Sequence, residues 1–246
     1  MTATPPEKSP TPAPAADGRI RVLLADDEEM IRHGVRLILR HAEDIDVVAE
    51  ARNGAEAVER AAAQPVDVVL LDIRMPVLDG LAAVARLVRL DPKPQVVMLT
   101  TFGDEENVTR ALHAGAGGFL LKDEGPQELI SAVRAAAAGD AVLSPGVTGH
   151  VVKRMLQGGG LIGTSSATAP ADQRLAALTG REREVLAMLG AGLPNLEIAR
   201  RLDIGLGTVK THVGRILEKT GTASRVQAAL LAHQAGLGGA TGAAGA

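Results

Sequence analysis

The chain has 246 residues, enough for one large domain or two ordinary ones, and no cysteine, which excludes disulfides and thiolate metal sites. Its net charge of −3 hides an asymmetry, because residues 19–140 carry 14 Lys/Arg against 21 Asp/Glu, whereas residues 174–235 carry 9 against 5. This suggests an acidic regulatory part and a basic part that binds nucleic acid. With no signal-peptide pattern in residues 1–18 and no apolar run long enough to span a bilayer, we expect a cytoplasmic protein that does not enter a membrane.

The first folded element is expected after residues 1–18, a tail too poor in large apolar residues to fold. Residues 19–140 alternate short apolar runs with amphipathic helical patterns, which predicts an α/β domain with five strands in a doubly wound parallel sheet. The expected strands are 20–25, 47–49, 66–71, 96–99 and 118–121, and the expected helices are 29–41, 55–63, 78–90, 105–114 and 126–138.

The rest of the chain is predicted to be a linker followed by an all-α domain of four helices. Residues 141–174 contain a run of three glycines and a Ser/Ala/Thr-rich stretch, so we expect a flexible linker with a short helix around 147–156. Helical periodicity in residues 175–235 places helices at 181–190, 196–202, 208–219 and 225–235. Residues 236–246, rich in Gly and Ala, are expected to be a disordered tail.

Polar residues occur where four of the predicted strands end. Asp26 and Asp27 follow the first strand, Asp72 the third, Thr100 the fourth and Lys122 the fifth. In parallel sheets the carboxyl ends of the strands share one edge, where ligands bind. Three carboxylates there would suit Mg²⁺, which prefers oxygen ligands, and without a cation they would raise each other's pKa.

This combination of groups predicts phosphoryl chemistry at Asp72. A carboxylate can attack phosphorus and form an aspartyl-phosphate. A metal ion would neutralise charge on the phosphoryl oxygens, while Lys122 and the Thr100 hydroxyl would bind the group once it arrives. Any single acid at a strand end could instead be a solvated turn residue, but that explanation is poor for four strand ends together.

Residues 20–140 resemble a bacterial response-regulator receiver domain along their whole length. The positions that carry the resemblance are Asp26-Asp27, Asp72, Met75-Pro76, Asp79-Gly80, Thr100, Phe119 and Lys122. The resemblance implies that Asp72 is the phosphoacceptor.

The same resemblance implies roles for the residues around Asp72. Asp27 and Asp72 would hold Mg²⁺ together with the backbone carbonyl of Arg74, and Asp26 would assist. Thr100 and Phe119 would form the switch pair, with the hydroxyl moving to the phosphoryl group and the ring following inward. Without the resemblance, Phe119 would be read as an ordinary core residue on a strand.

The C-terminal part contains two amphipathic helical patterns, 196–204 and 208–217, around a short turn with a glycine. The face of the second helix opposite its apolar side presents Lys210, Thr211, Gly214 and Arg215. A helix-turn-helix inserts such a helix in the major groove, where Lys or Arg can bind guanine and a threonine methyl can touch thymine. Periodicity alone is more typical of a helical bundle with a solvated basic face than of a DNA-binding helix.

Residues 178–230 resemble the LuxR/FixJ-type DNA-binding domain. The matching residues are Leu178-Thr179, Arg181–Leu186, Gly192-Leu193, Asn195, Glu197–Ala199, Thr208–Val213 and Ile216-Leu217. The resemblance implies that Lys210, Thr211 and Gly214 occupy the main DNA-contact positions, with Thr208 and Arg215 beside them. Gly214 offers no side chain, so one typical contact is missing. The last helix, about 225–235, would form the dimer interface.

Two helix starts depart from the family pattern. Pro194 removes the Ser-x-x-Glu capping box that usually precedes the first helix of the motif. Gly205 and Leu206 replace the usual Ser-Glu, which removes a favourable charge and exposes an apolar side chain. Thr179 and Glu182 keep a capping box of their own. We therefore expect a slightly unstable DNA-binding domain.

The two resemblances together indicate a two-component response regulator of the NarL/FixJ type. Such a protein would receive a phosphoryl group at Asp72 from a sensor histidine kinase, form a homodimer on activation and bind double-stranded promoter DNA. It would not be an enzyme, although it would take part in its own phosphotransfer and dephosphorylation.

Two alternatives from other classes remain open at this point. One is a protein descended from such a regulator that binds partners but no longer DNA, as Pro194, Gly205, Leu206 and Gly214 would allow. The other is a haloacid-dehalogenase-like phosphatase with an aspartyl nucleophile and Mg²⁺. Such enzymes need a second acid two residues after the nucleophile, and Arg74 at that position counts against this reading.

Overall fold

The computed structural model describes residues 18–100, 105–144, 148 and 171–237. Most of the two predicted tails and of the predicted linker, with nearly all of its expected short helix, lies outside these residues. Among the helices of the described ranges, none is both long and apolar enough to cross a membrane.

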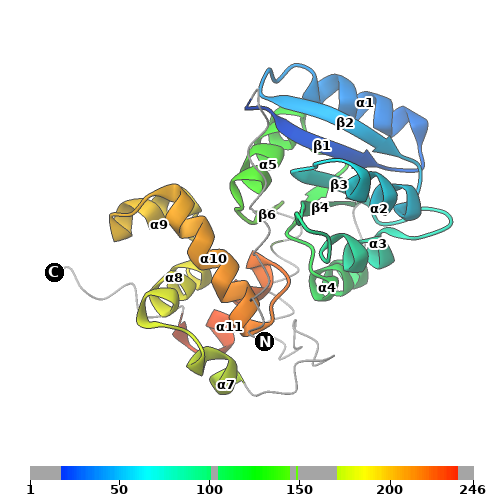
Figure 1. Cartoon of the computed structure of the whole chain (residues 1–246). Helices are drawn as coiled ribbons and strands as arrows, with labels where there is room; N and C mark the ends of the chain where they lie inside the picture. Colours follow the sequence, from blue (N-terminus) through cyan, green and yellow to red (C-terminus); the bar gives the residue numbers. More distant parts are fainter. Residues whose placement is uncertain (1–17, 101–104, 145–147, 149–170, 238–246) are drawn as a thin grey trace, which may run out of the picture.

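The N-terminal domain is built on a six-stranded sheet in which all neighbouring strands are parallel (Figure 1). The strand order is β2-β1-β3-β4-β5-β6, so the chain moves outward in both directions from β1, as expected for a doubly wound sheet. The strands are β1 (Ile20–Ala25), β2 (Ile45–Ala51), β3 (Val68–Asp72), β4 (Gln95–Thr100), β5 (Gly118–Leu121) and β6 (Val142–Leu143).

The sixth strand corrects the predicted count of five. β6 pairs with β5 through Gly118–Val142 and Phe119–Leu143, inside the range that was expected to be linker. Two residues are too short to give a recognisable alternation of apolar and polar positions. The strand nevertheless covers the outer edge of β5, the strand that leads to Lys122.

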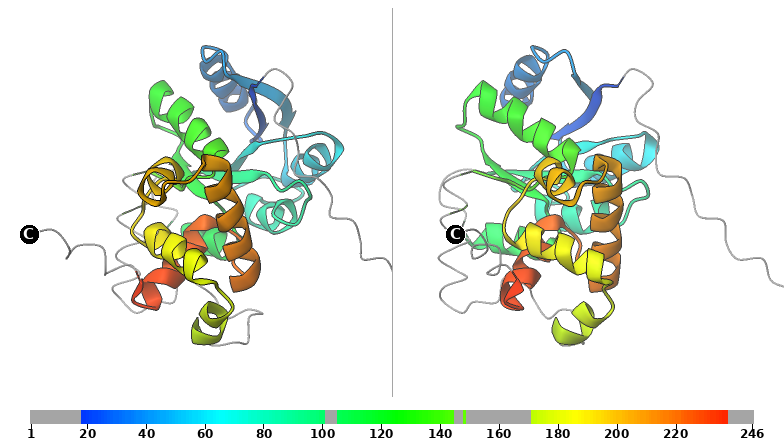
Figure 2. Two further views of the ribbon diagram at one scale, coloured as in Figure 1. Left: turned by 60° about the vertical axis from the view of Figure 1, so that its left-hand side comes forward. Right: turned by 90° about the vertical axis from the view of Figure 1, so that its left-hand side faces the viewer.

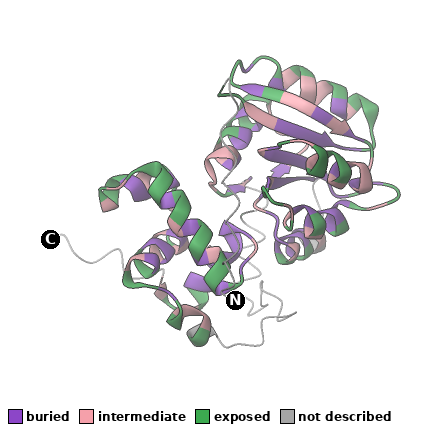
Figure 3. Cartoon of the chain, viewed as in Figure 1, coloured by how far each residue is buried: buried purple, intermediate pink, exposed green. Residues whose placement is uncertain are grey.

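Helices cover both faces of this sheet. They are α1 (Glu29–Leu39), α2 (Gly54–Ala63), α3 (Gly80–Leu87), α4 (Glu105–Ala114) and α5 (Pro126–Ala138). Residues of β3 alternate between two core clusters, with Val69 and Leu71 facing α2, α3 and α4, and Val68 and Leu70 facing α1 and α5. Because both faces are buried, the central strands read as continuous apolar runs, and Figure 3 shows them buried throughout.

The C-terminal domain is helical. Its elements are α7 (Ala171–Ala176), α8 (Gly180–Gly190), α9 (Asn195–Leu202), α10 (Leu206–Thr220) and α11 (Arg225–Gln234). The inward faces of α8 to α11 share one apolar core, to which α10 contributes Val209, Val213 and Ile216. α10 starts two residues earlier than predicted, because Gly205 in an extended conformation serves as its N-cap.

The two domains are in contact through α11 and α4. In Figure 2 the red helix α11 lies beside the green helix α4. Val226 and Leu230 of α11 are buried and belong to the same apolar cluster as Val108 and Leu112 of α4. The helix that was expected to form a dimer interface is thus used for packing within one chain.

Candidate acidic site and nucleic-acid interface

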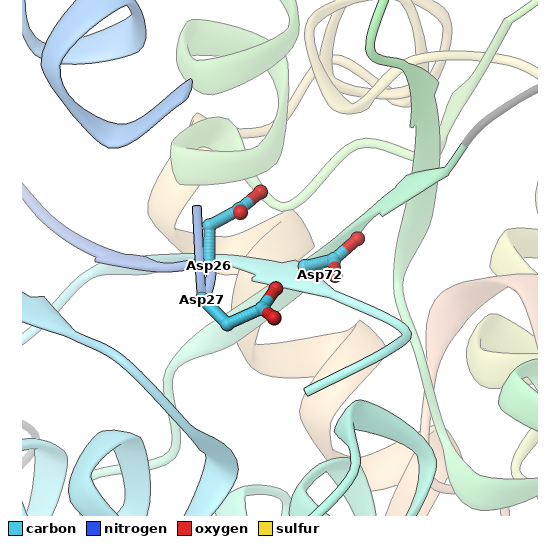
Figure 4. Close-up of side chains that lie close together, drawn as sticks. All are labelled: Asp26, Asp27 and Asp72. Carbon is cyan, nitrogen blue, oxygen red and sulfur yellow. The ribbon is translucent and has the colours of Figure 1, made fainter. Parts of the chain in front are cut away.

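The three predicted acids meet at the carboxyl edge of the sheet. Asp26 and Asp27 follow β1, and Asp72 is the last residue of β3, its neighbour in the sheet (Figure 4). Each offers a carboxylate oxygen, and these oxygens lie within 4.8 Å of one another. Asp26 and Asp72 are buried, whereas Asp27 is exposed, so the cluster opens to solvent on one side.

Lys122 joins this cluster from the loop after β5. Its Nζ atom lies 2.8 Å from Asp26 Oδ2 and 2.8 Å from Asp72 Oδ1. Its backbone N–H donates to the carbonyl oxygen of Thr100 at 2.8 Å, which ties the end of β5 to the end of β4. Burial lowers the pKa of Lys122, but hydrogen bonds to the two carboxylates outweigh it and raise that pKa above its usual value.

The environment of Asp72 disfavours its charged form. Burial raises its pKa above the usual value, and the nearby Asp26 carboxylate acts in the same direction, against the hydrogen bond from Lys122. The three carboxylates and the one ammonium group carry a formal charge of −2. A cation that approached this cluster would relieve both the repulsion and the cost of burial.

The backbone around Asp72 is fixed by a tight turn. The N–H of Arg74 donates to Asp72 Oδ2 at 3.2 Å, and the N–H of Gly80 donates to the carbonyl oxygen of Ile73 at 2.9 Å. A Cβ atom on Gly80 would lie 2.0 Å from the carbonyl oxygen of Asp72, so only glycine fits there. The Asp79-Gly80 pair of the sequence therefore closes the turn, with Asp79 capping α3 through Ala82.

The donor set fits a magnesium ion. Carboxylate oxygens are the ligands that Mg²⁺ prefers, and the exposed side of the cluster leaves room for the waters that this ion keeps. A surface pocket beside Asp27, lined among others by Arg74, Met75 and Asn107, gives a phosphoryl donor access to the same side. The expected ligand role of the Arg74 carbonyl stays a prediction.

The two predicted switch residues lie on adjacent strands. Thr100 is the last residue of β4 and is buried, and Phe119 on β5 pairs with Met98 of β4. The Phe119 ring is fully buried in the apolar cluster that includes Leu112 of α4. The ring therefore lies inward here, in contact with the layer of helices that includes α4.

The predicted DNA-reading residues share the exposed face of α10. Thr208, Lys210, Thr211, Gly214 and Arg215 are all exposed, whereas the apolar positions between them are buried in the domain core. The amphipathic pattern expected of a recognition helix is therefore present. Part of this face is turned toward the N-terminal domain, since Lys210 and Gly214 line a pocket between the two domains.

The C-terminal end of α5 receives donors from the other domain. The last carbonyl groups of a helix have no partner within the helix and carry partial negative charge. Here three successive carbonyl oxygens accept hydrogen bonds: Ala137 from Lys210 Nζ at 3.3 Å, Ala138 from Asn195 Nδ2 at 2.9 Å and Gly139 from Arg225 Nη1 at 3.3 Å. We call this set of contacts, together with those of Asp140, the docking contact.

Asp140 completes the docking contact. Its Oδ1 atom accepts a hydrogen bond from the backbone N–H of Asn195 at 2.8 Å and lies 3.3 Å from Arg225 Nη1. Asn195 is the first residue of α9. The N-cap of this helix, Pro194, makes no side-chain capping bond. The carboxylate of Asp140, from the other domain, therefore provides the acceptor for one backbone amide that the missing capping box leaves without a cap.

A second contact joins the end of α4 to α11. Gln227 Nε2 donates to the carbonyl oxygens of Leu112 at 2.6 Å and His113 at 3.2 Å, at the C-terminal end of α4. The side chain of Gln227 is buried between the domains. The C-terminal ends of both α4 and α5 are therefore capped by side chains of the C-terminal domain.

Sequence reasoning missed this interface and one buried arginine. Asp140, Arg225 and Gln227 are ordinary polar residues in sequence, and only the absent cap at Pro194 indicated an amide that needs an outside partner. Arg32 on α1 is also buried. Arg32 lies three residues before Val35 and seven before Leu39, which places it on the apolar stripe of the helix. This spacing could have indicated from the sequence that Arg32 is buried.

Comparison with known proteins agrees with both resemblances. Residues 22–134 match the model of the response regulator receiver domain, and residues 176–232 match that of the luxR family of bacterial regulatory proteins. The transcriptional regulatory protein LnrK of Bacillus subtilis is 40% identical over 218 residues, which cover 89% of this chain and 98% of that protein. The nitrate/nitrite response regulator protein NarL of Escherichia coli is 41% identical over 213 residues, covering 87% and 94%.

A solved structure shares the fold of part of the chain. A two-component response regulator of the LuxR family from Aurantimonas sp. SI85-9A1 is 27% identical with a TM-score of 0.53, and the match covers 56% of this chain and 99% of that one. The two family matches, the two relatives that cover most of the chain and the two observed domains all indicate the same family. This chain belongs to the response regulators that join a receiver domain to a LuxR-type DNA-binding domain, and it is a phosphorylation-controlled transcription regulator.

Proposed function

We propose that Asp72 accepts a phosphoryl group from a sensor histidine kinase and that this step frees the C-terminal domain to dimerise and bind promoter DNA. The observation that carries the first half is the meeting of three carboxylates and Lys122 at one edge of the sheet. The docking contact carries the second half, because it holds Lys210 of the reading helix against the receiver domain.

The transfer itself is a displacement at phosphorus. A carboxylate oxygen of Asp72 forms a bond to the phosphorus atom, and the bond from phosphorus to the imidazole nitrogen of the kinase histidine breaks, with the electron pair going to that nitrogen. Lys122, already bonded to Asp72, is placed to shift its bond to a phosphoryl oxygen. Thr100, at the end of the neighbouring strand, offers a hydroxyl to the same group.

Asp26, Asp27 and Asp72 would hold Mg²⁺, which supplies charge neutralisation for the phosphoryl oxygens. The residues of the chain act around that ion. Lys122 keeps Asp26 paired before the donor arrives, and the open side at Asp27 admits it. The same geometry would admit a water molecule for slow self-catalysed dephosphorylation, the only reaction that we assign to the protein acting alone.

The docking contact supports a closed, inactive arrangement before phosphorylation. A lysine that donates to a helix carbonyl is unavailable to a DNA phosphate or a guanine. Lys210 and Gly214 also line a pocket between the two domains, so this part of the face of α10 lies next to the receiver domain while the domains are docked. Release of the docking contact would free Lys210 and move the receiver domain away from this face.

The α4–α11 contact supports a link between release and dimerisation. Val226 and Leu230 of α11 are buried against the receiver domain, so they are unavailable to a second copy of the chain. A shift of α4 driven from Thr100 and Phe119 would disturb the Gln227 bonds at its C-terminal end. Phosphorylation would thus shift an existing equilibrium from docked domains toward dimers, because it favours one of two packings of α11.

Phosphorylation can be tested directly. The full-length wild-type protein and an Asp72→Ala variant would be incubated with Mg²⁺ and a small phosphoryl donor, and the intact mass would be measured. We expect one phosphoryl adduct on the wild type and none on the variant. An adduct of equal yield on Asp72→Ala would show that another residue is the acceptor.

DNA binding separates this proposal from the interaction-protein alternative. Gel shifts with randomised duplexes at low salt, with and without beryllofluoride as phosphoryl mimic, would report binding by the wild type and by Lys210→Ala. We expect binding that the mimic strengthens and that weakens steeply with salt, because phosphate contacts release counterions. No shift in any condition would favour the alternative.

A further inference from the structure

Arg32 is a buried arginine that contacts the backbone of two residues of the acidic cluster. It occupies the first turn of α1 and is only 5% exposed. Its Nη1 atom donates to the backbone carbonyl oxygen of Asp26 at 2.8 Å and to that of Asp27 at 3.1 Å. One guanidinium group therefore binds the backbone carbonyls of both acids that follow β1.

The guanidinium is itself anchored to the neighbouring strand. Its Nε atom lies 3.6 Å from Glu50 Oε2 on β2, and Glu50 also accepts a hydrogen bond from Arg36 Nη1 at 3.0 Å. The N–H of Asp26 donates to the carbonyl oxygen of Ala51 at 3.2 Å. The loop that carries Asp26 and Asp27 is thus tied to β2 both directly and through Arg32.

We propose that Arg32 is a positioning residue for the metal site, which fixes the carboxylates of Asp26 and Asp27 by holding the peptide groups that follow them. The direction of a side chain depends on the backbone dihedral angles at its own Cα atom, so a peptide held on one side limits where the carboxylate can point. Asp27 needs this more than its neighbours, since it is exposed whereas Asp26 and Asp72 are paired with Lys122. This inference rests on the magnesium site of the proposed function.

A purely structural role would be to neutralise Glu50 within the fold. Arg36 provides the matched control, because it pairs with the same carboxylate from the same helix at a shorter distance, and the bonds found for its guanidinium go to Glu50 and His33 rather than to the acidic loop. If neutralising Glu50 were all that Arg32 does, loss of either arginine would affect the metal site in the same way.

The test is the dissociation constant of Mg²⁺, measured by calorimetric titration on the full-length protein, since the chain has no Trp or Tyr to report binding by fluorescence. Groups that orient metal ligands typically contribute about 10- to 100-fold to metal affinity. We expect Arg32→Met to weaken Mg²⁺ binding by about that factor and Arg36→Met to leave it unchanged. Thermal melting of each variant in chelator would show that both are folded before metal is added.

A second variant, Arg32→Lys, allows the same test if Arg32→Met does not fold. Arg32→Lys keeps the charge but supplies a single ammonium group, which cannot span the two carbonyls and Glu50 as a planar guanidinium does. We expect Arg32→Lys to bind Mg²⁺ with an affinity between those of the wild type and Arg32→Met. If Arg32→Met does not fold, the expected result is an affinity of Arg32→Lys below that of the wild type.

Three results would overturn the inference. Mg²⁺ affinities of the Arg32 variants equal to that of the wild type would remove the positioning role while leaving the metal site intact. Equal losses in Arg32→Met and Arg36→Met would assign the effect to Glu50 instead. Absence of Mg²⁺ binding in the wild type would overturn the metal site itself, and the role of Arg32 with it.

Discussion

The acidic edge of the receiver domain and the DNA-binding domain differ in where their polar partners come from. Asp26, Asp72 and Lys122 are paired with one another within a single domain. The DNA-binding domain instead obtains the partner for the first amide of α9, and two of the partners of Arg225, from the receiver domain.

This difference indicates how one domain can control the other. The acidic edge gains no partner from docking, whereas a helix with a missing cap is stabilised by the neighbour that supplies it. Pro194 leaves the N-terminus of α9 without a side-chain cap, and Asp140 fills that position only while the domains are docked. The departure from the family pattern thus favours the closed arrangement.

The largest expected effect tests how much the pairing of Lys122 with Asp26 and Asp72 stabilises the receiver domain. Lys122→Met would leave the buried Asp26 and Asp72 carboxylates unpaired, and breaking a buried pair in this way costs about 3–5 kcal/mol. We expect the receiver transition in urea unfolding, followed by circular dichroism in chelator, to lose about that amount. Mg²⁺ should restore part of it, because a bound cation would replace the missing charge.

The control for this variant is Arg134→Met. Arg134 pairs with Asp44 across the receiver surface, and both side chains are about half exposed. Exposed pairs contribute little to stability, so this change should be small and independent of Mg²⁺. A loss in Lys122→Met no larger than in Arg134→Met would contradict the account of the acidic edge.

The next effect tests the dependence of the helix-turn-helix on the receiver. Asp140→Ala removes the cap of Asn195 and the carboxylate beside Arg225, so docking should weaken by roughly 1–3 kcal/mol. We expect the unphosphorylated variant to bind nonspecific duplex DNA about tenfold more tightly than the wild type, a change of about 1.4 kcal/mol. Gel shifts at one fixed salt concentration would measure it.

Asp44→Ala controls for the change in net charge. It removes one carboxylate from the receiver surface at a position paired with Arg134, outside the docking contact. DNA affinity should then stay close to that of the wild type. An equal gain in both variants would mean that charge alone, rather than docking, sets the affinity.

A smaller effect concerns the capping box of α8, whose members both belong to the C-terminal domain. Glu182 completes the capping box with Thr179, and its carboxylate accepts a hydrogen bond from Lys219 Nζ at 2.7 Å. The hydrogen bond from Lys219, followed by those from Thr179, lowers the pKa of Glu182 to about 2. Because this pKa is depressed on folding, the carboxylate contributes stability above its unfolded pKa of about 4.3 and loses it as the pH falls toward 2.

The matching measurement compares wild type and Glu182→Gln by chemical unfolding between pH 7 and pH 3. We expect the variant to be less stable by about 1 kcal/mol at pH 7, the usual contribution of a cap, with the gap narrowing below about pH 4.5. A gap that stays constant over this range would show that the lost stability does not come from the charge of Glu182.

The smallest effect tests the weak start of α10. Gly205 has no side chain to cap the helix, and Leu206 is 40% exposed at its first position. Gly205→Ser with Leu206→Glu should raise the thermal stability of the C-terminal domain by about 0.5–1 kcal/mol, from a better cap and a charge that suits the helix N-terminus. Gly205→Ser with Leu206→Gln separates the two contributions, and no gain in either variant would refute the account of this helix start.

The sequence predicted the acidic edge well because strand ends in a parallel sheet are forced to one side. Apolar runs placed Asp26, Asp72, Thr100 and Lys122 there without knowledge of any contact. Helical periodicity likewise placed the exposed face of α10 correctly. These features depend on local patterns and on a rule of topology.

The parts that sequence could not supply depend on partners far apart in the chain. β6 is too short to show a pattern, and the bond from Asn195 to Asp140 spans 55 residues. The position of Arg32 on the apolar stripe of α1 indicates that it is buried, but its acceptors, two backbone carbonyl oxygens, cannot be predicted from the sequence.

The central claim is that phosphorylation at Asp72 exchanges docked domains for a dimer, and sizing by light scattering tests it most directly. Wild type and Asp72→Ala would be measured at one protein concentration in Mg²⁺, with and without beryllofluoride. We expect the mimic to shift the wild type toward a dimer and to leave Asp72→Ala monomeric. No shift in the wild type, or an equal shift in both proteins, would contradict the account.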